Sequence, residues 1–217
     1  MDKIKKEMRD RWNEKGWDYD KASAHGVHNH HAKNQWLNIF ENLEKDRKSK
    51  YFKTLDVGTG TGFLALIMAD LGYEVTAIDW STTMLSQAEK KAEEKNFEIE
   101  FIEGQTEGLP FPTDSFQMLT ARHVLWTLTE PAKALTEWYR VLEKDGIVLA
   151  DFSPKSKVHN AKHYSKEIEE QLPLNKSIEL EKLKELFEKA GFTYVSINKI
   201  KEETKHHQAT YLIKAVK

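Results

Sequence analysis

Apolar residues follow two alternating patterns along the chain from about residue 50 onward. Short β-prone runs, in which apolar side chains alternate with polar ones or form a brief stretch, predict strands over 51–57, 73–79, 97–103, 115–121 and 147–152. Longer segments between them have apolar residues three or four positions apart and predict helices over 62–71, 81–95 and 131–142. Strands that alternate with helices of this length predict βαβ units and a mainly parallel sheet.

The two ends of the chain depart from this alternation. An amphipathic helix is predicted over 178–190, followed by strand-like runs over 192–200 and 209–216 with no helix between them. Two strands joined in this way are expected to pair antiparallel, as a hairpin. The first fifty residues contain two polar helical segments, which cannot bury much surface alone. We therefore expect an N-terminal helical cap over residues 1–49 and a sheet domain over residues 50–217.

Composition restricts the class of protein. Hydrophobic residues make up 39% of the 217 positions, which is enough for a globular interior. The longest apolar run, 62–69, is too short to span a bilayer, and the N-terminus has no apolar signal-peptide core, so we expect a cytoplasmic protein without membrane partners. Cysteine is absent, which excludes thiolate nucleophiles and disulfides. A formal charge of -2 argues against a large nucleic-acid footprint.

A glycine-rich loop follows the first predicted strand. Gly58, Gly60 and Gly62 alternate with threonines where that strand ends and the next helix begins. Glycines let a ligand approach the backbone closely, and the free N–H groups of a helix N-terminus attract a carboxylate or phosphate. Because glycines also occur in ordinary strand–helix turns, this loop alone does not identify a ligand.

Two details narrow the ligand of this loop. The dinucleotide fingerprint has its third glycine one position later, where this chain has Phe63. Asp79 ends the next strand, 21 residues after Gly58, and a carboxylate there can accept hydrogen bonds from both hydroxyls of a ribose. Ser81 is available to cap the following helix, which leaves Asp79 for the ligand. The pattern therefore predicts a nucleoside ligand without a pyrophosphate.

Taken together, these segments resemble the class I S-adenosylmethionine-dependent methyltransferases of the methyltransferase domain 11 type. The resemblance is carried by residues 55–62, 77–85, 103–116 and 122–146. It implies an α/β fold with a Rossmann-like, mainly parallel seven-stranded sheet, a C-terminal antiparallel hairpin and an N-terminal helical cap. It also implies S-adenosylmethionine as the cofactor.

The resemblance further implies which residues bind the cofactor. They are Asp56, Gly58, Thr59, Gly60, Asp79, Trp80, Met84, Gln105, Thr106, Glu107, Arg122 and His123. The glycine loop would hold the methionine end and Asp79 the ribose, while residues 105–107 would surround the adenine. Many relatives carry Asp where this chain has Gln105, so the polar contact to the base is expected to differ here.

Transfer of a methyl group from a sulfonium mainly requires an acceptor held in line behind it. A general base is needed only when the nucleophile carries a proton that must leave. The candidates for the base or for acceptor contacts are Tyr19, His25, His28 and His123. A polar surface loop is the simpler explanation of the N-terminal histidines. No metal site is expected, because His28 and His31 have no clear third ligand.

We therefore expect a methyltransferase that acts on a small-molecule acceptor. Three alternatives stay open: non-methyl transfer or cyclisation with the same cofactor, methylation of RNA or protein, and a non-catalytic binding protein. The near-neutral charge counts against RNA, and the intact glycines with Asp79 count against a degenerate site. The acceptor and the choice between monomer and homodimer stay open.

Overall fold

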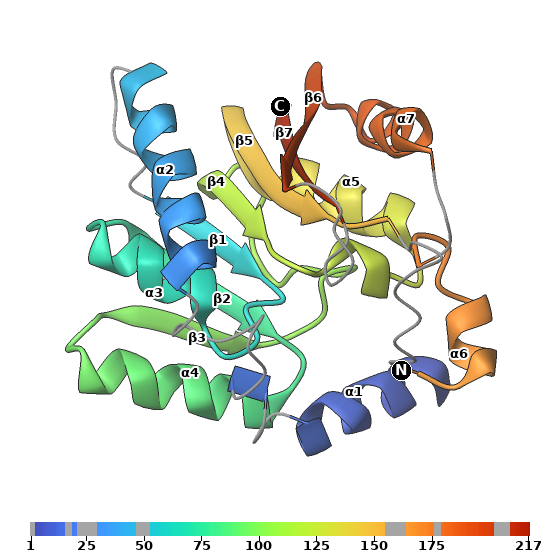
Figure 1. Cartoon of the computed structure of the whole chain (residues 1–217), viewed down its shortest axis with the longest axis horizontal. Helices are drawn as coiled ribbons and strands as arrows, with labels where there is room; N and C mark the ends of the chain where they lie inside the picture. The colour runs from blue at the N-terminus through green and yellow to red at the C-terminus, as the bar shows by residue number, and fades with distance from the viewer. Residues whose placement is uncertain are drawn as a thin grey trace.

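A seven-stranded sheet forms the centre of the computed structural model, which describes residues 3–15, 19–20, 30–46, 53–154, 164–175, 179–201 and 209–217 (Figure 1). The strands are β1 (Lys53–Val57), β2 (Glu74–Asp79), β3 (Ile99–Glu103), β4 (Phe116–Ala121), β5 (Leu142–Phe152), β6 (Tyr194–Lys201) and β7 (Thr210–Val216). Their order is β3-β2-β1-β4-β5-β7-β6, with β1 to β5 parallel and β7 antiparallel to both β5 and β6. The predicted Rossmann-like sheet with its C-terminal hairpin is confirmed.

Helices surround this sheet. They are α1 (Lys3–Lys15), α2 (His30–Asp46), α3 (Phe63–Asp70), α4 (Thr82–Glu94), α5 (Pro131–Val141), α6 (Lys166–Glu170) and α7 (Leu180–Ala190), with a 3₁₀ turn, η2 (Leu125–Thr127). The sequence pattern does not predict α6 or η2, because such short segments show no helical periodicity. Within the described ranges, no helix is long and apolar enough to cross a membrane.

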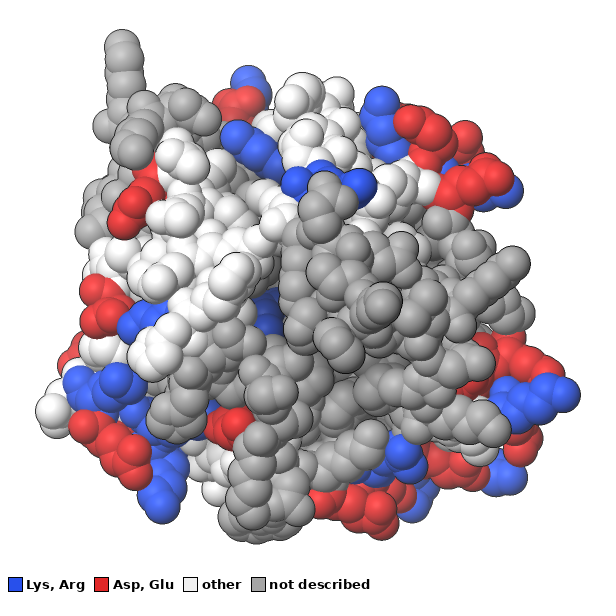
Figure 2. All heavy atoms as spheres, viewed as in Figure 1, with Lys and Arg blue, Asp and Glu red and all other residues white. Residues whose placement is uncertain are grey.

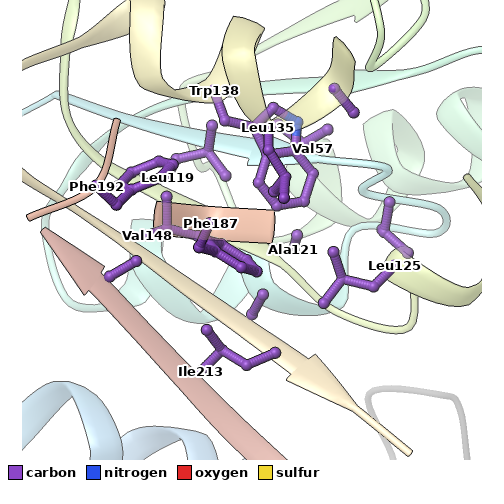
Figure 3. Close-up of a cluster of buried hydrophobic side chains, with 14 of the residues drawn as sticks. Val57, Leu119, Ala121, Leu125, Leu135, Trp138, Val148, Phe187, Phe192 and Ile213 are labelled. Carbon is purple, nitrogen blue, oxygen red and sulfur yellow. The ribbon is translucent and has the colours of Figure 1, made fainter. Parts of the chain in front are cut away.

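Side chains of the central strands alternate between the two faces of the sheet. Leu119 and Val148 point to the face covered by α5 and α7, where they pack with Trp138 and Phe187 (Figure 3). The adjacent residue Met118 points to the opposite face, toward the cluster formed with α2 and α3. A parallel sheet covered on both faces needs apolar residues on both, which explains the short unbroken apolar runs in the sequence.

The two N-terminal helices occupy different places. Trp36 and Phe40 of α2 are buried against α3 and the sheet, so α2 completes the helical layer on that face. α1 packs instead against α4, and its buried Met8 lies in a small cluster with Tyr164 and Ile168 (Figure 1). The first fifty residues therefore contribute α2 to the helical layer on one face of the sheet and α1 to a separate position beside α4.

β5 begins five residues before the start that the apolar pattern indicates. Phe116 of β4 pairs with Leu142, and Met118 pairs with Ile147, so the intervening residues bulge out of the ladder. Asp145 in this bulge has a φ of 62°, a left-handed conformation that Asp tolerates better than most residues. Strand pairing thus continues on both sides of residues 143–146, where the sequence predicts a turn.

Candidate active site

A pocket opens at the carboxyl ends of β1, β2 and β4, where open α/β sheets bind their ligands. It is lined by Trp12, Tyr19, Gly58, Gly60, Ile78, Asp79, Trp80, Met84, Gly104, Gln105, Thr106, Glu107, Arg122, His123, Val124, Thr127 and Leu128. The empty space between these residues, including the part open to solvent, amounts to about 720 Å³. All residues that the sequence assigns to the cofactor line this pocket except Asp56 and Thr59.

The glycine loop forms one wall of the pocket. Gly60 has a φ of 54°, and no protein atom lies within 4 Å of the place where a Cβ would stand. Because Gly60 lines the pocket, a side chain there would enter the ligand space. Gly58 has a φ of 62°, and a Cβ there would approach the Cγ2 of Val124 to 2.5 Å. The loop thus requires glycine for its backbone conformation and for its close packing.

Asp56 lies behind this loop and is 1% exposed. Its Oδ2 accepts a hydrogen bond from the Thr59 hydroxyl at 2.7 Å, and its Oδ1 accepts one from the Thr120 hydroxyl at 2.6 Å. Burial raises the pKa of Asp56 to about 6. The Asp56 carboxyl group therefore links the glycine loop to β4 and supports the loop that forms this wall of the pocket.

Asp79 faces the pocket from the end of β2. Its Oδ2 accepts a hydrogen bond from the Gly60 N–H, and its Oδ1 accepts one from the Ser81 N–H, both at 2.9 Å. Burial raises the pKa of Asp79 to about 6. A carboxylate has about four acceptor positions, so these bonds leave capacity for a diol. The predicted helix cap is confirmed, because the Ser81 hydroxyl accepts a hydrogen bond from the Met84 N–H.

The loop over residues 104–111 forms the opposite wall, and α5 fixes its position. The buried Trp138 donates its indole N–H to the Thr106 hydroxyl at 2.8 Å. Glu137 accepts a hydrogen bond from the Leu109 N–H, and Arg140 donates to the carbonyl oxygens of Leu109 and Phe111. The Arg140 guanidinium also holds the pKa of the Glu137 carboxyl below its usual value. These supporting roles of Glu137, Trp138 and Arg140 cannot be read from the sequence alone.

The N-terminal segment covers one side of the pocket. We call α1 together with residues 19–20 the lid. Trp12 and Tyr19 of the lid line the pocket. Asp20 accepts hydrogen bonds from the Thr61 hydroxyl and from Lys91, each at 2.6 Å, and so joins the lid to the glycine loop.

Two further contacts anchor α1 to the pocket walls. The Asn13 Oδ1 accepts a hydrogen bond at 2.7 Å from the hydroxyl of Ser81, two residues after Asp79 in the chain. The Lys5 ammonium is almost fully buried and lies 3.5 Å from the Glu107 carboxylate and 2.8 Å from that of Glu130. These hydrogen bonds raise the pKa of Lys5 despite its burial. Asp20, Asn13 and Lys5 thus each contact a loop that also borders the pocket.

The candidates for a catalytic role are distributed unequally. His123 and Tyr19 both line the pocket. His123 has a φ of 60°, its main-chain N–H donates to the Asp151 Oδ1, and its Nδ1 lies 3.4 Å from the Asp151 Oδ2. Burial raises the pKa of Tyr19 to about 12, so Tyr19 remains a neutral phenol. His25 and His28 lie outside the described residues.

No role in this site is assigned to Trp12, Asp151 or Phe63 in the sequence analysis. Trp12 stands in a polar helix whose position over the sheet is not predictable from its pattern. Asp151 carries one usable signal, because it lies near the end of a strand in the parallel part of the sheet. Phe63 occupies the position of the missing glycine, and the Arg122 guanidinium lies 4.0 Å from the centre of its ring.

In the described ranges, no group of three or more His, Cys, Asp or Glu residues could hold a metal ion.

The sheet order and this pocket define a class I S-adenosylmethionine-dependent methyltransferase fold. Residues 55–150 match the family model described as a methyltransferase domain. The chain is also 32% identical over 179 residues to a demethylmenaquinone methyltransferase of Listeria welshimeri. The matched region covers 71% of this chain and 76% of the relative. The chain therefore belongs to the S-adenosylmethionine-dependent methyltransferase family.

Two other relatives extend this comparison. A demethylmenaquinone methyltransferase of Thermus thermophilus is 38% identical over 118 residues, which covers 53% of this chain and 52% of that protein. The chain thus spans about half the length of this curated relative. A solved structure from Thermotoga maritima, described as an S-adenosylmethionine-dependent methyltransferase and possible histamine N-methyltransferase, matches with a TM-score of 0.68 at 18% identity. It covers 96% of this chain and 99% of its own, and the likeness is one of fold.

The cofactor of this family is S-adenosylmethionine, and the residues present fit it. The loop at Gly60 leaves the space that a side chain would fill, and the main chain there can approach a ligand. Asp79 presents a buried carboxylate beside this space, which suits a ribose diol. The aromatic ring of Trp80 offers an apolar surface to a base.

Proposed function

We propose that this chain transfers a methyl group from S-adenosylmethionine to a small-molecule acceptor. The observation that carries this proposal is the pairing of the open space at Gly60 with the Asp79 carboxylate, 19 positions apart in the chain and joined by a 2.9 Å hydrogen bond. This pairing brings the glycine loop and the ribose-binding candidate to one wall of the pocket.

Each wall has its own part in this proposal. The main chain at Gly58 and Gly60 receives the methionine end of the cofactor, with the Arg122 guanidinium near its carboxylate. Asp79 accepts hydrogen bonds from the ribose hydroxyls. Trp80, Met84 and residues 105–107 enclose the adenine. Asp56 and Thr59 act through the loop that they support.

Methyl transfer needs few further groups from the protein. The cofactor, when bound, supplies a methyl group that is already electrophilic. The protein has to hold the acceptor in line with that group and exclude water while it reacts. The lid serves both purposes, because Trp12 and Tyr19 form an aromatic wall of the pocket and its polar anchors close the gap to the glycine loop.

Two features support a small molecule over a macromolecule as the acceptor. The lid covers one side of the pocket and restricts the space beside it. On the face shown in Figure 2, Lys and Arg side chains are interspersed with Asp and Glu side chains around the rim of the molecule. A continuous basic surface is the usual sign of RNA binding, and the described atoms of this face do not form one.

Calorimetry with S-adenosylhomocysteine, combined with a labelled-methyl transfer screen, tests the proposal. The screen should contain hydroxyl, thiol, amine and carboxylate metabolites, with products identified by mass spectrometry. We expect binding of S-adenosylhomocysteine and a product heavier by one methylene than its acceptor. Absence of binding would overturn the proposal. Consumption of the cofactor without a methylated product would instead favour cyclisation or transfer of another group.

A further inference from the structure

Asp151 makes two contacts to a single residue of the pocket wall. It lies near the carboxyl end of β5 and is 4% exposed. Its Oδ1 accepts a hydrogen bond from the main-chain N–H of His123, and its Oδ2 lies 3.4 Å from the Nδ1 of the same residue. A buried carboxylate that contacts both the backbone and the ring of one histidine controls where that ring lies.

The backbone of His123 is itself unusual. Its φ of 60° is a left-handed conformation, which is strained for a residue other than glycine and persists only where the surroundings impose it. The hydrogen bond from its N–H to Asp151 is one such restraint. The side chain of His123 is 30% exposed and lines the pocket. Backbone strain, a buried carboxylate and a pocket-facing imidazole therefore coincide at one position.

We propose that Asp151 is a positioning residue that keeps His123 in the tautomer of a general base, and that the acceptor carries a hydroxyl or thiol proton. This inference rests on the proposed methyl transfer. A hydrogen bond from the Nδ1–H to Asp151 leaves the Nε2 without a proton, which is the form that can accept one. The 3.4 Å separation brings the Nδ1 within reach of the Asp151 carboxylate, and catalytic hydrogen bonds tighten when the reacting complex forms.

The proton and electron balance of the step is complete. The His123 Nε2 takes the proton from the acceptor O–H or S–H, and the lone pair left on that oxygen or sulfur forms the bond to the methyl carbon. The bond between that carbon and the cofactor sulfur breaks, and its electron pair stays on the sulfur as a thioether. The imidazolium next to Asp151 then releases its proton to water.

Other ionisable groups near His123 do not replace it as the base. Tyr19 is a neutral phenol, since burial raises its pKa to about 12. Arg122 is adjacent in the chain and carries a fixed positive charge. Asp79 is assigned to the ribose hydroxyls in the proposed function. Among the described residues of the pocket, His123 combines an imidazole with a buried carboxylate behind it.

The tautomer of His123 can be measured without an acceptor. Long-range ¹H–¹⁵N spectra of the protein saturated with S-adenosylhomocysteine report which ring nitrogen carries the proton, and His123→Gln identifies the signal among the nine histidines. We expect an unprotonated Nε2 in the native protein and a protonated Nε2 in Asp151→Asn, whose amide donates to the ring. Asp151→Glu, which keeps the carboxylate, should restore the native tautomer.

Asp70→Asn is the matched control, because Asp70 is a carboxylate at the end of α3 that is exposed and pairs with Lys33. It should leave the His123 signals unchanged. A protonated Nε2 in the native protein, or the same tautomer in native protein and Asp151→Asn, would overturn the inference. Loss of S-adenosylhomocysteine binding by the native protein would instead defeat the proposed function, so the two failures are distinguishable.

The acceptor class has its own test. Labelled-methyl transfer is measured for phenols and thiols beside tertiary amines and thioethers, which have no proton to lose. We expect products from the first group, with transfer reduced about 100- to 10,000-fold in Asp151→Asn, the range that a general base contributes. Products from the second group alone would contradict the inference, as would equal transfer rates in native protein and Asp151→Asn.

Discussion

The two walls of the pocket are built in different ways. On the cofactor side, the contacts join neighbouring strand ends: Gly60 donates to Asp79, 19 positions away, and Thr59 donates to Asp56, 3 positions away. On the lid side, the contacts join distant parts of the chain, since Lys5 bonds Glu130 across 125 positions. The first wall is held rigidly by the sheet beneath it, whereas the second depends on a few polar anchors.

This difference predicts different consequences for ligand binding. Changes in the rigid wall should alter equilibrium affinity, because that wall supplies the direct contacts to the cofactor in the proposed function. Changes in the lid anchors should mainly alter how fast the ligand leaves, because the lid closes the path to solvent. Four variants or conditions separate the two walls, and S-adenosylhomocysteine serves as the ligand in each.

Gly60→Ala should have the largest effect on the rigid wall. Its methyl group would enter the ligand space, so we expect the affinity to fall at least about 100-fold, since the loop needs close backbone approach. The left-handed φ should lower the free energy of unfolding by only about 1–2 kcal/mol. Gly72→Ala, with a φ of 81° after α3, is the control that has the same backbone cost. Equal affinities of the two variants in calorimetry would show that Gly60 does not face the ligand.

Asp79→Ala should come next. It removes the carboxylate acceptors for the ribose hydroxyls, and hydrogen bonds to charged groups contribute roughly 1.5–3 kcal/mol, so the affinity should fall about 30-fold. S-Adenosylhomocysteine affinity is compared by calorimetry with that of Asp114→Ala, whose carboxylate is exposed and pairs with Lys217. An unchanged affinity of the Asp79 variant would mean that the ribose lies elsewhere.

Asp20→Ala tests the lid. It removes the contacts to Thr61 and Lys91, so the lid should open more often and the ligand should dissociate about tenfold faster, measured by stopped-flow fluorescence. Asp10→Ala is the control, because Asp10 also belongs to the lid but pairs with Lys6 on the exposed side of α1. A dissociation rate that does not change in Asp20→Ala would show that these anchors do not retain the ligand.

The pH dependence should be the smallest effect. The pKa of Asp79 is raised to about 6, and the ribose hydroxyls need the ionised carboxylate, so binding releases the proton and is favoured at higher pH. The affinity should be constant above about pH 7 and fall about fourfold by pH 5.5, because the competent fraction of the protein falls. Asp79→Ala should lose this dependence. A decrease of equal size in that variant would assign the titration to another group.

Much of the cofactor wall is predictable because it consists of local patterns. A glycine loop after one strand and a carboxylate at the end of the next are brought together by parallel pairing of β1 with β2, which is the default for such βαβ units. Ten of the residues assigned to the cofactor from the resemblance line the pocket for this reason. Asp56 and Thr59 belong to the same motif, but their side chains face the interior of the protein. The alternation of side chains along a strand does not predict which way a side chain points where the strand ends.

The lid and the base are harder to predict because they depend on packing between distant segments. Both N-terminal helices look alike in sequence, yet α2 joins a sheet layer and α1 lies over the pocket, because Trp36 and Phe40 give α2 a larger apolar face to bury. Trp12 therefore shows no local sign of its place. Asp151 likewise becomes meaningful only when β5 pairs beside β4 and brings its carboxylate to His123.

The sequence by itself determined the fold class and the family, and it named most of the pocket wall that we assign to the cofactor, because periodicity and short motifs act within one strand–helix unit. Tertiary structure decided which helix became the lid, where Asp56 points and which carboxylate accompanies His123. Those features depend on contacts between residues that are 28 or more positions apart, or on which side of a buried loop a side chain faces. The free energy of such contacts comes from burial and pairing in the folded chain, so no local pattern records them.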